Sequence, residues 1–215
     1  LLATKPPVFL MDEPLSNLDA RLRMDMRVEL KRFQAAARAT TVYVTHDQTE
    51  AMTMSTRVVV MKDGEIQQLA APGDLYHQPG NTFVADFIGM PRINLIALCA
   101  ETPRTSIYTN GDMRLDLGWG PGVDDIVLGA RPEDLVVSRQ ITPASEQYTV
   151  TAVLPNGPET IVQLTRGKTA VIARVAHDST YREGEHLHVQ YTTKALNIYD
   201  AKTGVIMPSD HRQCD

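Results

Sequence analysis

The sequence predicts an α/β region followed by an all-β region, and two differences in pattern indicate this division. Residues 1–90 alternate short apolar runs with longer amphipathic runs, which is typical of strands and helices in turn. From about residue 100 onward, short β-branched runs are separated by Gly, Pro and Asn, which is typical of strands and turns. A connector, Gly89-Met90-Pro91-Arg92, lies between the two patterns. We therefore expect one domain over residues 1–90 and a second over residues 91–215.

The first region begins with a short strand that ends at two acidic residues. Residues 8–11 are uniformly apolar and too few for a helix. Asp12, Glu13 and Pro14 follow, and a proline removes a backbone donor and restricts the residue before it. We expect the strand to stop near the acids, with Glu13 extended. Residues 41–45 predict a second buried strand, which ends at His46.

A helix is predicted after each strand. The first carries an apolar stripe at three- and four-residue intervals, made of Leu18, Leu22, Met26, Leu30 and Phe33. The arginines between residues 21 and 32 occupy its other faces, which we interpret as a solvated surface. Ser16 and Asp19 stand in capping-box spacing at its start, and Asp47 and Glu50 repeat that spacing before the second helix.

A hairpin and two short helices complete the first region. Residues 57–70 predict a hairpin with Asp63-Gly64 at its turn, and residues 72–88 resemble two short helical segments. Parallel sheets are stable only with several strands and with both faces covered. Two parallel strands and a hairpin are too little sheet for these apolar runs. We therefore expect further strands of the same sheet to precede Leu1.

The residues at the ends of the two strands predict a site for phosphoryl transfer. Ligands of open α/β sheets bind beyond the carboxyl ends of the strands, and a right-handed crossover would place Asp12, Glu13 and His46 at one edge. Two carboxylates beside a histidine, without a Ser or Cys nucleophile, suit activation of water against a phosphoryl group near Mg²⁺. An arbitrary pair of acids would only solvate a strand end. The joint pattern favours the catalytic interpretation.

These motifs resemble those of ATP-binding cassette (ABC) proteins. VFLMDEP resembles the Walker B strand, SNLDA the D-loop and VTHDQTEAM the H-loop, and residues 64–96 are similar to importer ATPases of the maltose and glycerol-phosphate type. Residues 1–7 resemble the end of the helix that follows the signature motif. The resemblance implies the C-terminal part of a P-loop NTPase domain over residues 1–90. Over residues 91–215 it implies an OB-like barrel, the TOBE domain, with a regulatory and dimerising role.

The resemblance also implies a role for each matched residue. Asp12 would be the Walker B aspartate that acts on Mg²⁺, Glu13 the catalytic base, and His46 the switch residue at the γ-phosphate. Ser16 and Asp19 would belong to the D-loop, at the nucleotide site facing a partner subunit, although capping a helix is an equal alternative for Asp19. The implied cofactors are ATP and Mg²⁺. The implied partners are a second ATPase subunit or second copy, transmembrane permease subunits and, indirectly, a solute-binding protein.

An ATPase of this class also needs a Gly-rich phosphate loop, GxxxxGK[ST], which these 215 residues do not contain. The only Gly-Lys-Thr is Gly167-Lys168-Thr169, and Val162 stands where the pattern requires glycine. A β-branched run follows instead of a helix, so we interpret these residues as a hairpin turn. An LSGGQ-like signature is also absent from the sequence. We therefore do not expect the chain alone to complete an ATPase site.

The second region resembles the regulatory domain of these importer ATPases in LGARPEDL and in residues 157–160, GPET. The chain departs from the family at Ala70 of the first region, where glycine is frequent, and at Asn197-Ile198-Tyr199 of the second region, where His-x-Phe is usual. His186 and His188 alternate on one predicted strand, but no third metal ligand accompanies them, so we interpret them as ordinary strand residues. An OB-like barrel could also bind oligonucleotides, but a basic, aromatic-rich face is lacking.

Composition limits the remaining possibilities. The net charge of −5 and the interspersed signs argue against nucleic acid as a partner, and no apolar run approaches the length of a membrane span. The resemblance to importer ATPases implies a cytoplasmic protein, peripheral on the inner face of the membrane, that couples ATP hydrolysis to uptake of a carbohydrate or sugar phosphate. Two alternatives remain open: a non-catalytic regulatory or dimerisation module, and a DNA-repair ABC ATPase.

Overall fold

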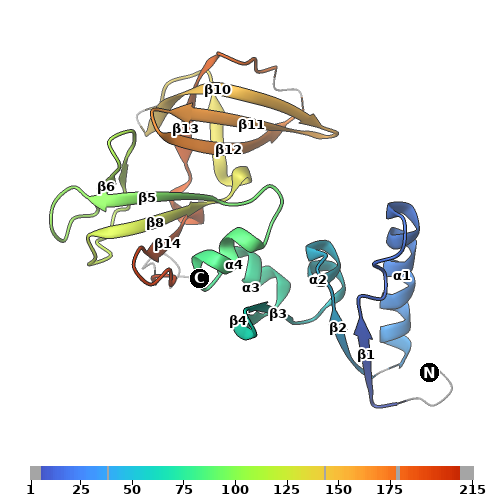
Figure 1. Ribbon diagram of the computed structural model, residues 1–215. Coiled ribbons are helices and arrows are strands. Elements are labelled where there is room, and N and C mark those ends of the chain that lie inside the picture. Colours follow the sequence, from blue (N-terminus) through green and yellow to red (C-terminus); the bar gives the residue numbers. More distant parts are fainter. Residues whose placement is uncertain (1–5, 38, 143, 178–179, 209–215) are drawn as a thin grey trace. The chain divides into compact units, whose positions relative to one another are not determined.

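The computed structural model describes residues 6–37, 39–142, 144–177 and 180–208 (Figure 1). The chain forms two compact units, Leu1–Leu75 and Tyr76–Asp215. The predicted domain boundary between residues 90 and 91 lies C-terminal to this division and stays a prediction. The resemblance of residues 1–7 to a helix end falls largely on residues 1–5, which are outside the described residues. The fold class is confirmed, because an α/β alternation precedes a long series of antiparallel strands.

The first unit has the predicted order of strands and helices. Strand β1 (Val8–Asp12) and strand β2 (Thr40–Val44) pair in parallel, with Asp12 opposite Val44, and helix α1 (Ala20–Ala37) connects them. Helix α2 (Gln48–Met54) follows β2. A hairpin of β3 (Val58–Lys62) and β4 (Glu65–Ala70) comes next, and helix α3 (Pro72–His77) runs to the end of this unit and into the next.

The two faces of the β1–β2 sheet differ in their exposure. Phe9 is buried and meets Phe33 of α1 edge to face, with the ring centroids 5.4 Å apart. The opposite face consists of exposed aliphatic side chains: Val8, Leu10, Val42 and Val44. Leu10 is 79% exposed. A parallel sheet is normally covered on both faces, so this exposure supports the expectation of further sheet, which stays a prediction.

The helix caps confirm one prediction and correct another. Asp47 caps α2 as expected, because its carboxylate accepts hydrogen bonds from the amides of Thr49 and Glu50. Glu50 does not complete a capping box, since the Asp47 amide donates to the Thr45 hydroxyl instead. At α1, the predicted capping box is wrong. Asp19 lies directly before the helix and accepts from the Leu22 amide at 2.9 Å, while the Ser16 hydroxyl donates to the Glu13 carbonyl. A carboxylate one residue before the first helical position satisfies the free amides better than a hydroxyl four residues away.

Turns with glycine in the left-handed region occur where two hairpins were predicted. Asp63 and Gly64 have φ of +52° and +82° between β3 and β4, as a two-residue turn requires. Gly167, at φ +56°, turns the chain between two strands of the second unit, and Asp112 Oδ2 accepts from the amides of Lys168 and Thr169. The interpretation of Gly167-Lys168-Thr169 as a hairpin turn is confirmed.

The second unit is built from antiparallel strands after one further helix. It contains α4 (Thr82–Phe87), two short 3₁₀ helices (Pro132–Asp134 and Thr193–Ala195) and the strands β5 (Asn94–Ala100), β6 (Ile107–Thr109), β7 (Arg114–Asp116), β8 (Asp125–Ala130), β9 (Leu135–Ser138), β10 (Ser145–Asn156), β11 (Glu159–Arg166), β12 (Thr169–Ala176), β13 (His186–Tyr191) and β14 (Asn197–Asp200). The strands form two five-stranded sheets, in the orders β12-β11-β10-β13-β9 and β14-β8-β5-β6-β7.

One hydrophobic core is shared by these two sheets. Leu98 and Leu128 of one sheet and Leu164 and Leu187 of the other belong to the same buried cluster. Buried Asn94 also joins the sheets, because its amide donates to the carbonyls of Ala130 and Ile172 and accepts from the Ile172 amide. Strands β5, β6 and β7 were not predicted individually. β6 and β7 have only three residues each, too few to show a periodicity.

Two further observations concern metals and membranes. The described residues contain no group of three or more His, Cys, Asp or Glu side chains that could hold a metal ion, and His186 and His188 lie on β13. No helix in the described part of the chain is long and apolar enough to cross a membrane.

Candidate active site at the ends of two parallel strands

The parallel pairing of β1 and β2 brings Glu13 and His46 into contact. Because Asp12 lies opposite Val44, the residues that follow each strand emerge at the same edge of the sheet. His46 Nδ1 lies 2.9 Å from Glu13 Oε1, which is hydrogen-bond distance. Their side chains are 74% and 45% exposed, so the pair is open to a ligand. Of the predicted catalytic residues, these two meet directly.

The backbone of Glu13 is not extended, which corrects the prediction based on Pro14. Glu13 has φ of +42°, in the left-handed region. Its amide donates to the Val44 carbonyl at 2.9 Å, and its carbonyl accepts from both the amide and the hydroxyl of Ser16. These bonds outweigh the local preference set by proline. A non-glycine residue in this region costs roughly 1–3 kcal/mol, and such residues cluster at functional sites.

The other predicted site residues lie close by along the chain but have different environments. Asp12 is exposed at the last position of β1. Ser16 holds the turn after Glu13 through the Glu13 carbonyl, and Asp19 caps α1. The structure therefore gives Asp19 its capping role, while a D-loop role for Ser16 and Asp19 stays a prediction.

The contact with Glu13 sets the electrostatics of His46. The hydrogen bond that His46 donates to Glu13, together with the negative charge of Glu13, raises the pKa of His46 above its ordinary value, and the charges of Asp47 and Glu50 add smaller effects in the same direction. A raised pKa in the folded state means that the pair stabilises the fold below about pH 6.5, the ordinary histidine value, and that this stabilisation is lost as pH rises through the folded pKa.

The substitution Glu13→Gln is expected to lower the pKa of His46 toward the ordinary histidine value, because it removes the carboxylate charge while keeping the side-chain shape. An NMR titration of the His46 ring in the 215-residue chain measures this change. Glu29→Gln is the matched control, since Glu29 is exposed on α1 and pairs with Arg32. If the pKa of His46 shifted equally in Glu13→Gln and Glu29→Gln, the result would contradict the contact between Glu13 and His46.

The donor set of this edge suits a magnesium ion that is shared with phosphates. Mg²⁺ is usually bound by one or two carboxylates together with substrate phosphates and water. Asp12 and Glu13 supply two carboxylates, and no larger cluster of ligating side chains occurs among the described residues. These residues fit an ion whose other ligands are phosphate and water oxygens, and the described residues do not form an all-protein cage.

The network of ion pairs that joins α1 to the residues following His46 was not predicted from the sequence. Arg27 was interpreted as part of a solvated face, but its side chain is only 13% exposed. Its Nη2 lies 2.7 Å from Asp47 Oδ2 and 3.6 Å from Glu50 Oε1. The partners are about 20 residues apart in the sequence, so no local spacing indicated this ion pair. The arginine face of α1 is therefore partly an internal contact surface.

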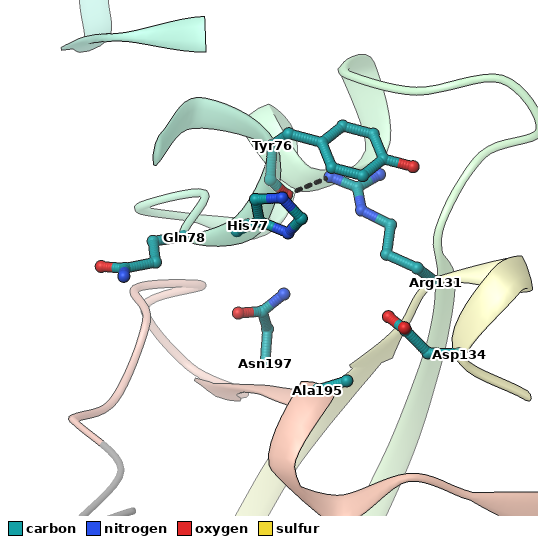
Figure 2. Close-up of a pocket in the computed structure, with 7 residues that line it drawn as sticks. All are labelled: Tyr76, His77, Gln78, Arg131, Asp134, Ala195 and Asn197. Carbon is teal, nitrogen blue, oxygen red and sulfur yellow. Dashed lines mark hydrogen bonds between the residues drawn. The ribbon is translucent and has the colours of Figure 1, made fainter. Parts of the chain in front are cut away.

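A shallow cavity of about 210 Å³ lies in the second unit (Figure 2). Its lining residues are Tyr76, His77, Gln78, Arg131, Asp134, Ala195 and Asn197. Arg131 is only 3% exposed, and its guanidinium stacks on the Tyr76 ring, 4.1 Å from the centroid. The guanidinium donates to the carbonyls of Tyr76, Ala85 and Ile88. These contacts give Arg131 a structural role, because they hold the ends of α3 and α4. Burial lowers the pKa of the Arg131 guanidinium.

Comparisons with known proteins bear on the identity of the chain. No protein-family model matches it. The xylose/arabinose import ATP-binding protein XacK of Haloferax volcanii is 44% identical over 209 residues, which cover 93% of this chain and 54% of the relative. The trehalose/maltose import ATP-binding protein MalK of Thermococcus litoralis is 41% identical over 214 residues, covering 93% and 57%. The xylose/arabinose import protein XacJ of H. volcanii is also 41% identical.

The matches cover only part of each curated relative. The chain spans about half the length of the curated relatives that it matches. A solved structure of the cytoplasmic molybdate-binding protein ModG aligns with 49% of the chain at 10% identity and a TM-score of 0.39. The curated relatives alone show that the chain is a homologue of sugar-import ABC ATP-binding proteins, of which it matches the C-terminal part.

Proposed function

We propose that this chain supplies one catalytic edge of an ATPase subunit that drives solute import. The observation that carries the proposal is the 2.9 Å contact between Glu13 Oε1 and His46 Nδ1 at the carboxyl ends of two neighbouring parallel strands. Both residues lie in motifs that resemble those of ABC proteins. In this proposal Glu13 orients or deprotonates the attacking water, and His46 contacts the transferring phosphate.

The orientation of the histidine ring suits this division of labour. Because Nδ1 faces Glu13, Nε2 is the ring atom left to donate to a phosphate oxygen. The carboxylate favours the protonated ring, which donates from both nitrogens. Glu13 itself lies in the turn that follows β1, with φ of +42°. The pair thus joins an acceptor for a water proton to a donor for a phosphate.

In this proposal, the nucleotide and the metal ion bind at the exposed end of β1. Asp12 would hold Mg²⁺. When ATP is bound, the charge of this ion would neutralise the negative charge that develops on the phosphates. Ser16 and Asp19, which follow in the D-loop motif, would face a second ATPase subunit. Both ATP and Mg²⁺ need contacts from a phosphate-binding half, because the chain contains no Gly-rich loop.

The cargo and the assembly are proposed from the relatives. The relatives are named as import proteins for xylose and arabinose or for trehalose and maltose, so we propose a carbohydrate or sugar phosphate as cargo. The subunit would act as a homodimer or paired with another ATPase subunit, on transmembrane permease subunits at the cytoplasmic face of the membrane. A solute-binding protein would deliver the cargo indirectly. Residues 91–215 would form the TOBE domain, with a regulatory and dimerising role.

The 215-residue chain alone is expected to show no ATP hydrolysis above the buffer background. Joining it to the N-terminal part of the MalK relative, which precedes the matched region, is expected to produce hydrolysis. Phosphate release from both proteins, measured at equal concentration with Mg²⁺-ATP, checks the proposal.

Two results would count against it. Hydrolysis by the chain alone that Glu13→Gln abolishes would show that the site needs no further half. A joined protein that folds and binds labelled ATP without hydrolysing it would favour the alternative of a non-catalytic module.

A further inference from the structure

The position of His46 depends on the backbone around it. The His46 side chain is 74% exposed, and its described side-chain contact is the one to Glu13. An exposed side chain with a single hydrogen bond has several rotamers available to it. The residues on either side of His46 must therefore supply most of the constraint.

Thr45 is held by a buried carboxylate. Its hydroxyl donates to Glu50 Oε2 at 2.9 Å and accepts from the Asp47 amide at 3.0 Å, so one side chain spans the His46 position. The Tyr43 hydroxyl donates to the same Glu50 oxygen at 2.8 Å. Glu50 is only 3% exposed, and burial together with the Glu50 hydrogen bond raises the pKa of Tyr43, which keeps that phenol a donor.

Asp47 is held from two directions on the other side of His46. Its Oδ1 accepts from the Thr49 and Glu50 amides at the start of α2. Its Oδ2 accepts from Arg27 of α1 at 2.7 Å, and Arg27 also lies 3.6 Å from Glu50. Arg27 thus ties α1 to both carboxylates that flank the His46 turn. Arg27 and Asp47 are 13% and 22% exposed, so their ion pair carries a desolvation cost, and specifying one conformation is one role proposed for such pairs.

We propose that Arg27 and Glu50 are positioning residues that act through Thr45 and Asp47 to hold His46 against Glu13. The catalytic meaning of this inference rests on the proposed function. Neither residue touches the reacting atoms in this scheme. Arg27 and Glu50 instead select the one backbone arrangement of residues 45–47 in which the ring reaches the carboxylate.

The test uses the 215-residue chain and two substitutions that leave Glu13 and His46 in place. Thr45→Val removes the hydroxyl at nearly constant shape, and Arg27→Gln removes the shorter of the two arginine contacts that join α1 to Asp47, the other being Arg23 at 3.5 Å. Arg32→Gln is the matched control, because Arg32 lies on the same helix and pairs only with exposed Glu29 among the described residues. The readout is the nuclear Overhauser effect between the His46 ring protons and the Glu13 side chain, with circular dichroism to verify folding.

We expect the signal in the unmodified chain and in Arg32→Gln, and its loss in Thr45→Val and Arg27→Gln. Its persistence at full intensity in folded Thr45→Val would overturn the positioning inference and leave the proposed function intact. Its absence from the unmodified chain would remove the Glu13–His46 contact on which the proposed function stands. If Arg27→Gln does not fold, Thr45→Val decides the question, since it changes neither charge nor helix α1.

Discussion

Replacing Glu13 by Gln in a complete ATP-binding protein that contains this chain is expected to lower the rate of ATP hydrolysis by about two to four orders of magnitude. Glutamine keeps the length of the side chain and can still fill the position beside His46. It cannot accept a proton from water, and it carries no charge to hold the His46 ring protonated. Because the main-chain bonds of Glu13 do not involve its side chain, the turn after β1 should persist.

Steady-state phosphate release and binding of labelled ATP, measured on the same preparations, separate a loss of chemistry from a loss of nucleotide. ATP binding should remain while turnover falls. Glu29→Gln controls for the loss of one carboxylate, because Glu29 is an exposed residue of α1 whose ion-pair partner is Arg32. An unchanged rate in Glu13→Gln would show that Glu13 is not the base.

The substitution Arg131→Met is expected to lower the free energy of unfolding of the second unit by roughly 2–4 kcal/mol. Methionine approximates the volume of the side chain but supplies no donor. The carbonyls of Tyr76, Ala85 and Ile88 would lose their guanidinium partner, and the stacking on the Tyr76 ring would lose its charge. Buried acceptors without partners are the main source of the expected loss.

Chemical denaturation followed by tryptophan fluorescence measures this effect selectively. The chain has one tryptophan, Trp119, which packs against the core of the second unit. Arg92→Met is the matched control, because Arg92 is 76% exposed and its ion pair with Asp86 should contribute at most about 1 kcal/mol. Equal denaturation midpoints for Arg131→Met and the unmodified chain would contradict the structural role of Arg131.

Much of the first unit and its candidate site could be predicted from local pattern. The apolar run before Asp12 and the TVYVT run before His46 became neighbouring parallel strands, and Asp47 capped the following helix. The right-handed crossover rule predicts from the sequence alone that Glu13 and His46 lie at one edge of the sheet. The Asp63-Gly64 turn followed in the same way from the residue types that tolerate positive φ.

The failures share a cause, which is the competition between local preference and distant partners. Pro14 favours an extended Glu13, yet bonds to Val44 and Ser16 impose a left-handed conformation. The arginine face of α1 has the spacing of a solvated surface, yet Arg27 is drawn inward by Asp47. Neither outcome can be predicted from the spacing of neighbouring residues.

The sequence by itself determined the order of the elements in the first unit, the edge at which the acids and the histidine lie, and the resemblance to ABC proteins, because these depend on periodicity, turn chemistry and short motifs. The tertiary structure alone decided which long-range partners hold these elements. Arg27 finds Asp47 and Glu50, and Arg131 finds carbonyls more than 40 residues away. The physical reason is that a buried charge takes its partners from whatever the fold brings within hydrogen-bond distance, and local sequence does not encode that choice.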